Sequence, residues 1–191
     1  MRTIQTDRLR LVPVTTANAE TLWRVLQQPG LREYQDLPDV DRSAFLRVVG
    51  GRPPRLSPGA TGRFEWLLHY VAGDEAPLGW VSLRISETSR TTGEIGYSVV
   101  REHRGKGVAT EAVAALVEEA FRRTRLREIR AYCVPANRSS LAVLRRVGFE
   151  EKGTLERGAT VHGKPVDVIA HCLPRERWTP RINRSPQATR S

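Results

Sequence analysis

Alternating apolar and polar residues, or runs rich in β-branched and aromatic residues, mark seven segments as β-strands. These segments are residues 8–14, 63–72, 78–86, 94–100, 128–134, 150–159 and 165–173. Four other segments repeat apolar residues at helical spacing, and we expect these helices to begin at Thr16 or Asn18, at Asp39 or Asp41, at Val108 and at Asn137. Gly148 is placed to end the last of them. The order β-α-α-β-β-β-α-β-α-β-β predicts a mixed α/β fold.

The length of 191 residues predicts a single domain, which we place at residues 1–178. Residues 179–191 are basic and poor in apolar side chains, so we expect a disordered tail there. No apolar run approaches the ~20 residues of a membrane span, and no signal-peptide pattern follows Met1. The two cysteines and four histidines show no spacing typical of a metal site or a disulfide framework. We therefore expect a cytoplasmic protein that binds no metal and no membrane.

The net charge of +10 would concentrate anions such as a coenzyme A nucleotide or RNA near the surface. A solvated basic surface is the alternative explanation, and no RNA-binding motif is visible. Nucleic acid is therefore not the expected partner, although association with RNA or the ribosome stays an alternative.

One stretch combines a strand, a glycine-containing turn and the start of a helix: residues 99–112, VVREHRGKGVATEA. The first turn of such a helix has backbone N–H groups without intrahelical partners and the positive end of the helix dipole. Gly105 and Gly107 leave those groups accessible, while Arg104 and Lys106 add positive charge. The stretch therefore predicts an anion site that suits a pyrophosphate. It does not match the P-loop, and Thr110 stands where the Rossmann fingerprint needs its third glycine.

Arg104-x-x-Gly107-x-Ala109 resembles the Arg/Gln-x-x-Gly-x-Gly/Ala signature of the GNAT superfamily of N-acetyltransferases. Further segments resemble the branch that acetylates the N-terminal alanine or serine of ribosomal proteins: TDRLRL at 6–11, EIGY at 94–97, GKGVATEA at 105–112, NRSS at 137–140 and RVGF at 146–149. The resemblance spans residues 3–178. It implies the GNAT acyl-CoA N-acyltransferase fold, a mostly antiparallel sheet of about seven strands flanked by about four helices.

The resemblance also implies acetyl-CoA as co-substrate and assigns residues to it. Backbone groups of Tyr97, Ser98 and Val99 would pair with the pantetheine amides and polarise the thioester carbonyl. Asn137 would cap its helix and contact the pantetheine. The pyrophosphate would be received by Arg104, Gly105, Lys106, Gly107, Val108, Ala109 and Thr110.

Two residues are candidates for catalysis. Glu94 is placed by the resemblance as a general base, acting directly or through water, and its alternatives are an exposed strand-end acid or an ion pair with an arginine. Leu144 stands where many relatives carry a tyrosine that protonates the leaving thiolate. Ser140 is the residue that the ribosomal branch would offer instead, and its alternative is an ordinary helix serine. Glu111, in the first turn of its helix, is expected to be structural.

Together these features predict an acetyl-CoA-dependent N-acetyltransferase acting on a primary amine. The acceptor is either the α-amine of a ribosomal or other protein or a small amine, and the protein is a monomer or homodimer. The glycine- and proline-rich loop at 50–62 and Tyr34 are candidates to border the acceptor site. A non-catalytic acyl-CoA-binding or sensing module stays an alternative.

Overall fold

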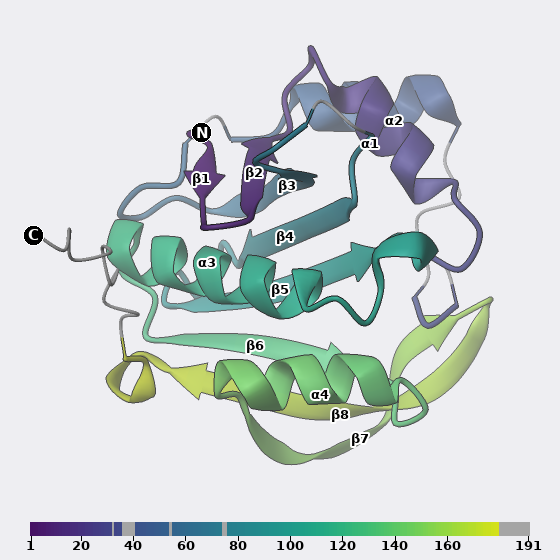
Figure 1. Cartoon of the computed structure of the whole chain (residues 1–191). Helices are drawn as coiled ribbons and strands as arrows, with labels where there is room; N and C mark the ends of the chain where they lie inside the picture. The colour runs from purple at the N-terminus through teal and green to yellow at the C-terminus, as the bar shows by residue number, and fades with distance from the viewer. Residues whose placement is uncertain (32, 36–40, 54, 74–75, 180–191) are drawn as a thin grey trace, which may run out of the picture.

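The computed structural model describes residues 1–31, 33–35, 41–53, 55–73 and 76–179. Their centre is an eight-stranded sheet in the order β1-β2-β3-β4-β5-β6-β8-β7 (Figure 1). The strands are β1 (Ile4–Gln5), β2 (Leu9–Pro13), β3 (Gly62–Tyr70), β4 (Gly79–Ile85), β5 (Thr92–Val99), β6 (Glu128–Cys133), β7 (Glu150–Val161) and β8 (Lys164–Pro174). All neighbours run antiparallel except β5 and β6, which are parallel.

The four helices are α1 (Ala19–Leu26), α2 (Arg42–Gly50), α3 (Val108–Arg123) and α4 (Arg138–Val147). Short 3₁₀ turns follow β5, at Arg101–His103, and β8, at Arg175–Arg177. The predicted mixed α/β fold, its element order and all seven strands are confirmed, with ends shifted by a few residues. The sequence analysis missed β1, because two residues are too few to show an alternating pattern.

Finer predictions concerned the residues at which two helices begin and the C-terminal tail. Asp41 caps α2, since its Oδ1 accepts the Ala44 N–H at 2.9 Å, whereas Asp39 lies outside the described residues. Asn18 stands at the N-cap of α1 but makes no side-chain cap there. Apart from Thr179, the tail expected to be disordered, residues 179–191, lies outside the described residues, so its disorder stays a prediction. No helix within the described ranges has the length and apolar character that crossing a membrane requires.

The sheet has one pair of helices on each face, and alternation along each strand sends side chains to both. On β4, Trp80 joins the cluster formed with α1 and α2, while its neighbour Val81 joins the cluster beneath α3. Helix α3 buries the residues at helical spacing that the sequence analysis identified, including Val108, Ala112 and Leu116. Its position across the middle of the sheet fixes where its N-terminus lies.

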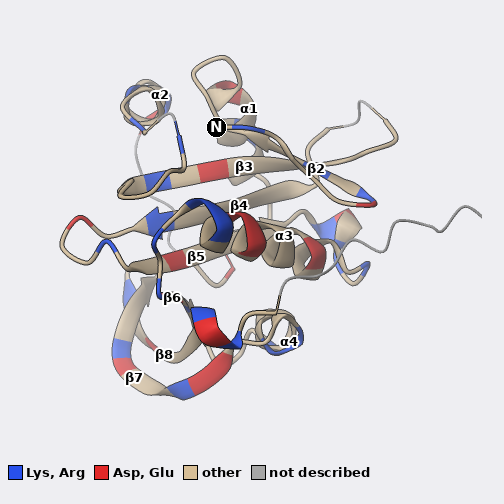
Figure 2. Ribbon diagram, turned by 90° about the vertical axis from the view of Figure 1, so that its left-hand side faces the viewer, with Lys and Arg blue, Asp and Glu red and all other residues tan. Residues whose placement is uncertain are grey.

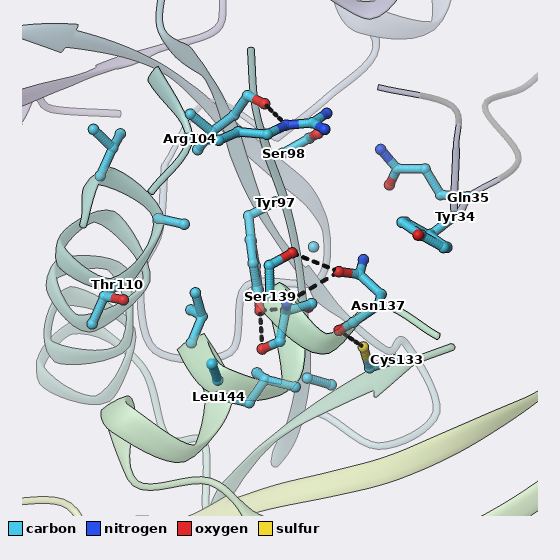
Figure 3. A pocket seen from close by; sticks show the side chains of 18 of the residues that line it. Tyr34, Gln35, Tyr97, Ser98, Arg104, Thr110, Cys133, Asn137, Ser139 and Leu144 are labelled. Atoms are coloured by element: carbon cyan, nitrogen blue, oxygen red, sulfur yellow. Dashed lines mark hydrogen bonds between the residues drawn. The ribbon is translucent and has the colours of Figure 1, made fainter. Parts of the chain in front are cut away.

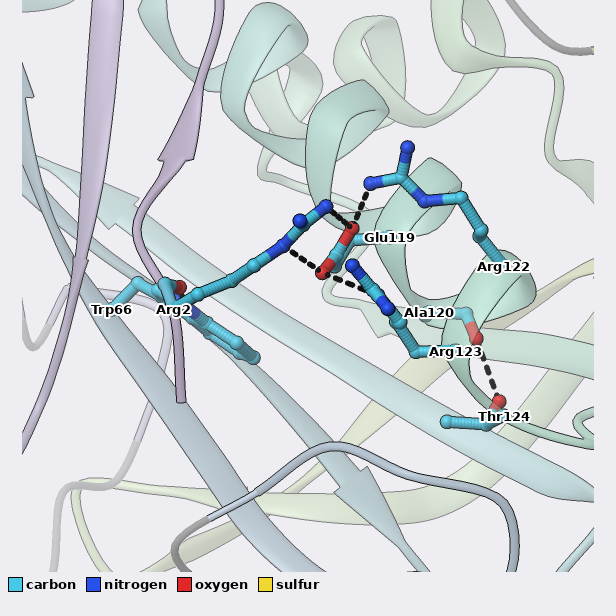
Figure 4. Close-up of polar contacts among 7 residues, drawn as sticks. All are labelled: Arg2, Trp66, Glu119, Ala120, Arg122, Arg123 and Thr124. Atoms are coloured by element: carbon cyan, nitrogen blue, oxygen red, sulfur yellow. Dashed lines mark hydrogen bonds and ion pairs between the residues drawn. The ribbon is translucent and has the colours of Figure 1, made fainter.

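Ionic contacts attach the N-terminal segment to both ends of α3. In the first turn, Glu111 accepts a hydrogen bond from Thr6 Oγ1 at 2.6 Å and another from Arg8 Nε at 2.7 Å. Near the last turn, Glu119 is 2.9 Å from Arg2 Nε, and the side chains of Arg122 and Arg123 also contact it (Figure 4). Glu111 is therefore structural, as expected, and it explains why the Thr6–Arg8 segment accompanies the helix motif in this sequence.

The strands β5 and β6 separate after a short paired region. Their pairing ends at Glu94 and Arg130, although β5 continues to Val99 and β6 to Cys133. Beyond this point the edge of β5 that faces β6 is available to another extended chain. Basic and acidic residues are interspersed along the ribbon of the sheet (Figure 2). Arg84 and Glu94, for example, form a cross-strand ion pair.

Candidate active site

A cavity of about 330 Å³ lies where β5 and β6 separate. The first turns of α3 and α4 form one side of it, and residues from the α1–α2 connection lie across from α3 (Figure 3). Its lining includes ten of the eleven residues expected to bind the cofactor: Tyr97, Ser98, Val99, Arg104, Gly105, Gly107, Val108, Ala109, Thr110 and Asn137. Ser140 also lines it. The fold thus brings together segments that are more than 40 residues apart in the sequence.

The N-terminus of α3 opens into this cavity without a side-chain cap. Gly107 is its N-cap residue, with φ of 79°, and Gly105 precedes it with φ of 75°. Both conformations belong to the left-handed region that glycine adopts without strain. By contrast, the side chains of Asp41 and Asn137 cap α2 and α4. The first N–H groups of α3 therefore have no side-chain cap, and their role as an anion site stays a prediction.

Arg104 reaches the cavity, but its guanidinium is held by the protein. Its Nε donates to the Val99 carbonyl at 2.9 Å, and its Nη2 donates to the Gly30 carbonyl at 2.9 Å. Glu33 lies 3.8 Å away as an ion pair. The side chain thus ties the α1–α2 connection to the end of β5. Lys106 is the one expected cofactor residue that does not line the cavity, and its carbonyl accepts a hydrogen bond from Arg8.

At the other end of the cavity, five polar side chains gather around the first turn of α4. Asn137 Oδ1 accepts the Ser140 N–H at 3.1 Å and the Ser139 hydroxyl at 2.9 Å. The Tyr97 hydroxyl lies 2.8 Å from Ser140 Oγ. Cys133 Sγ donates to the Asn137 carbonyl at 3.6 Å. Burial raises the pKa of the Tyr97 phenol and of the Cys133 thiol, so both groups stay protonated at neutral pH.

Glu94 lies outside the residues that line the cavity. It occupies the paired part of β5, and its Oε2 accepts a hydrogen bond from Arg84 at 2.6 Å. Register with Trp80 and Arg84 places Ser98 and Glu94 on the α1–α2 face of the sheet, opposite Tyr97. The ion pair named as an alternative is therefore present, and the general-base role stays a prediction.

Several lining residues were missed or were placed differently by the sequence analysis. Tyr34, a candidate to border the acceptor site, lines the cavity together with Gln35, whereas none of the described residues of the 50–62 loop does. Arg146 was missed as a lining residue, although it follows Ala142 by one helical turn on α4. Tyr97 was expected to act through its backbone alone. Within the described residues no group of His, Cys, Asp and Glu has the arrangement of a metal site.

Comparison with known proteins places this geometry in a family. The profile of the acetyltransferase (GNAT) domain matches residues 8–150. The uncharacterized N-acetyltransferase p20 of Bacillus licheniformis is 27% identical over 174 residues, which cover 91% of this chain and 96% of that protein. The [ribosomal protein uS5]-alanine N-acetyltransferase of Escherichia coli is 31% identical over 86 residues, which cover 45% of this chain and 44% of that protein.

Solved structures show the same fold. The ribosomal L7/L12 alpha-N-protein acetyltransferase RimL, in complex with coenzyme A, superposes with a TM-score of 0.76 and 18% identity. The superposition covers 92% of this chain and 99% of that chain. The segment Arg104-x-x-Gly107-x-Ala109 leads into the helix whose N-terminus lines the cavity. Because the family profile covers most of the chain, the protein belongs to the GNAT family of acetyltransferases.

Proposed function

We propose that this protein transfers the acetyl group of acetyl-CoA to the α-amine at the N-terminus of a protein. The observation that carries the proposal is the cavity itself. It joins an uncapped helix N-terminus, suited to a pyrophosphate, to the free edge of β5 and to a polar cluster around Ser140. The three features follow one another in the order of the phosphate, pantetheine and thioester parts of the co-substrate.

Acetyl-CoA binds with its pyrophosphate at the N–H groups that follow Gly107. The glycine conformation and the helix dipole supply the attraction, because the Arg104 guanidinium is already bonded to two carbonyls. The pantetheine arm adds to the edge of β5 at Tyr97, Ser98 and Val99, in the manner of an extra strand. Asn137 holds the first turn of α4 beside it.

The acetyl transfer then needs a neutral amine and a proton for the leaving thiolate. The amine attacks the thioester carbon, the C–S bond breaks, and its electron pair goes to sulfur. Ser140 gives that sulfur a proton, and the amine loses one to water or to Glu94. Glu94 and Ser98 lie on the α1–α2 face of the sheet. The acceptor approaches from this face, where β5 and β6 have separated.

The names of the relatives support a protein N-terminus as acceptor, since one acts on the alanine of ribosomal protein uS5 and another on the α-amine of L7/L12. The test is release of coenzyme A from acetyl-CoA with three acceptors: peptides beginning with Ala or Ser, the same peptides with a blocked α-amine, and small polyamines. We expect turnover with the free peptides alone. Turnover with polyamines alone would refute the acceptor class, and binding of acetyl-CoA without turnover on any acceptor would identify a non-catalytic acyl-CoA-binding module.

The assignment of Glu94 is tested separately by Glu94→Gln. If Glu94 takes the proton of the amine, the rate falls at neutral pH and recovers at high pH, where the amine is already deprotonated. The matched control is Glu118→Gln, which removes a carboxylate from the same protein outside the cavity. An unchanged pH–rate profile would leave Glu94 with the ion pair to Arg84 as its role.

A further inference from the structure

One hydrogen-bonded contact joins the two walls of the cavity. Tyr97 projects from β5 toward the first turn of α4 (Figure 3), and its hydroxyl lies 2.8 Å from Ser140 Oγ and 3.2 Å from the Ser140 carbonyl oxygen. Tyr97 faces α4 because side chains alternate along β5, which sends the neighbouring Ser98 to the other face. The serine is thus held at its backbone by Asn137 and at its hydroxyl by Tyr97.

The two hydroxyls have one proton each, so the direction of their hydrogen bond matters. If Tyr97 donates to the Ser140 carbonyl and Ser140 donates to Tyr97, the serine proton points at the wall of the cavity. If Tyr97 donates to Ser140 Oγ, the serine proton is available to a group inside the cavity. A developing thiolate is a stronger acceptor than a neutral phenol, which favours the second arrangement during the reaction.

We propose that the Tyr97 hydroxyl orients the Ser140 hydroxyl, so that Ser140 directs its proton to the sulfur of the leaving coenzyme A thiolate. This inference rests on the proposed acetyl transfer. When the C–S bond breaks and its electron pair goes to sulfur, the Ser140 proton goes to the same sulfur. Water that carries the proton lost by the amine then returns a proton to Ser140. Tyr97 acts through Ser140 and is a positioning residue.

The surroundings of Tyr97 suit a donor that keeps its own proton. Burial outweighs the opposing effect of the Ser140 hydrogen bond and raises the pKa of the phenol. Tyr97 therefore stays neutral throughout the pH range in which the amine is reactive. Below the serine on the same helix face, Leu144 is buried and offers no competing polar group.

The test is a double-mutant cycle with Tyr97→Phe, Ser140→Ala and the double variant, assayed with the acceptor peptide that the wild type acetylates. Tyr97→Phe keeps the ring and its packing, and it should lower kcat about 10-fold, less than the ~100-fold low end for direct general acids. KM for acetyl-CoA should stay within about 2-fold, because the orientation matters only as charge develops on sulfur. The double variant should match Ser140→Ala, since Tyr97 acts through the serine. Ser140→Thr should recover activity that Ser140→Ala loses.

Tyr70→Phe is the matched control, since it removes a phenol hydroxyl from β3 at a residue that does not line the cavity and keeps the ring that packs against His103. An unchanged kcat in Tyr97→Phe would overturn the inference while leaving the proposed function intact. A double variant whose loss equals the product of the two single losses would also overturn it, because Tyr97 would then act independently of Ser140. A wild type that releases no coenzyme A with any acceptor would refute the proposed function itself, and the inference with it.

Discussion

The two ends of α3 are built in opposite ways. At the C-terminal end, the Arg175 guanidinium donates hydrogen bonds to three backbone carbonyls. These are the carbonyls of Leu126, Phe121 and Thr124, at 2.5, 2.7 and 2.8 Å. Thr124 Oγ1 also donates to the Ala120 carbonyl at 2.7 Å. At the N-terminal end, the N-cap residue is Gly107, and no side chain caps the first turn. One end is closed by the protein, and the other is left open to the cavity.

Both ends need hydrogen-bond partners from outside the helix, since a helix leaves four N–H groups and four carbonyls without intrahelical partners. Side chains bond the carbonyls of Ala120, Phe121 and Thr124 at the C-terminal end, whereas no side chain caps the N–H groups at the N-terminal end. The difference shows that the open end is not a consequence of loose packing, because Glu111, one turn further on, is firmly bonded to Thr6 and Arg8. Hydrogen bonds to Glu111 thus anchor the first turn of α3, while no side chain caps its N–H groups.

A substitution at Gly107 is the strongest test of the proposed pyrophosphate site at the uncapped end of α3. Gly107→Asp should lower the affinity for acetyl-CoA by about 100-fold, because a carboxylate at ~4 Å from a phosphate costs several kcal/mol at the effective dielectric of a protein surface. Gly107→Asn is the matched control, since asparagine tolerates the same left-handed conformation and has no charge. It should lower affinity by about 10-fold at most. Calorimetric titration measures both, and equal affinities for the two variants would remove the pyrophosphate from this turn.

At the closed end, Arg175→Lys should lower the free energy of unfolding by about 2 kcal/mol, because a single ammonium cannot reach three carbonyls and leaves buried acceptors unpaired. Arg177→Lys is the control on the same 3₁₀ turn, where the Arg177 side chain is 64% exposed and pairs with Glu150. It should change stability by less than about 0.5 kcal/mol. Urea unfolding checks both values. The affinity of Arg175→Lys for acetyl-CoA should match that of the wild type, and a parallel loss of affinity would show that the two ends are coupled.

A smaller effect is expected at Glu119, which lies near the negative end of the α3 dipole and is compensated by three arginines. Glu119→Gln should lower the free energy of unfolding by about 1 kcal/mol, because the amide keeps some hydrogen bonds and loses the charge. Glu118→Gln is the control, because Glu118 forms no ion pair with the residues that the structure describes, and it should have little effect. Equal losses in the two variants would show that the arginine cluster contributes no stability of its own.

The smallest effect is a change in acid stability. Burial alone would raise the pKa of Glu111 and Glu119, but hydrogen bonds and the charges of their arginine partners outweigh it and lower both pKa values below 4.5. Groups with a lowered pKa stabilise the fold above their unfolded pKa, and that stability is lost as the pH falls through the folded pKa. Urea unfolding between about pH 5 and 3 should show stability falling in the wild type and falling less steeply in Glu119→Gln. If the free energy of unfolding fell equally steeply with pH in both proteins, the pKa of Glu119 would be the same in the folded and unfolded states.

Much of this protein is determined by its sequence alone. The periodic apolar residues determine the strands and helices, because burying one face is what stabilises each element. Gly105 and Gly107 determine the left-handed turn that leads into α3, because such a turn is a local property. Cap residues such as Asn137 and Gly148 act within a few residues and were identified for the same reason.

The tertiary structure determines which distant residues these local features contact. The separation of β5 and β6 depends on how two strands that are distant in sequence pair, and it creates the cavity. The hydrogen bond between Tyr97 and Ser140 joins residues that are 43 positions apart, so no local sequence pattern predicts it. The Arg104 guanidinium was assigned to phosphate from its charge, whereas folding brings the Gly30 and Val99 carbonyls within 2.9 Å of it. Local patterns determine elements and turns, while side-chain partners across the chain are selected by packing, which sequence periodicity does not encode.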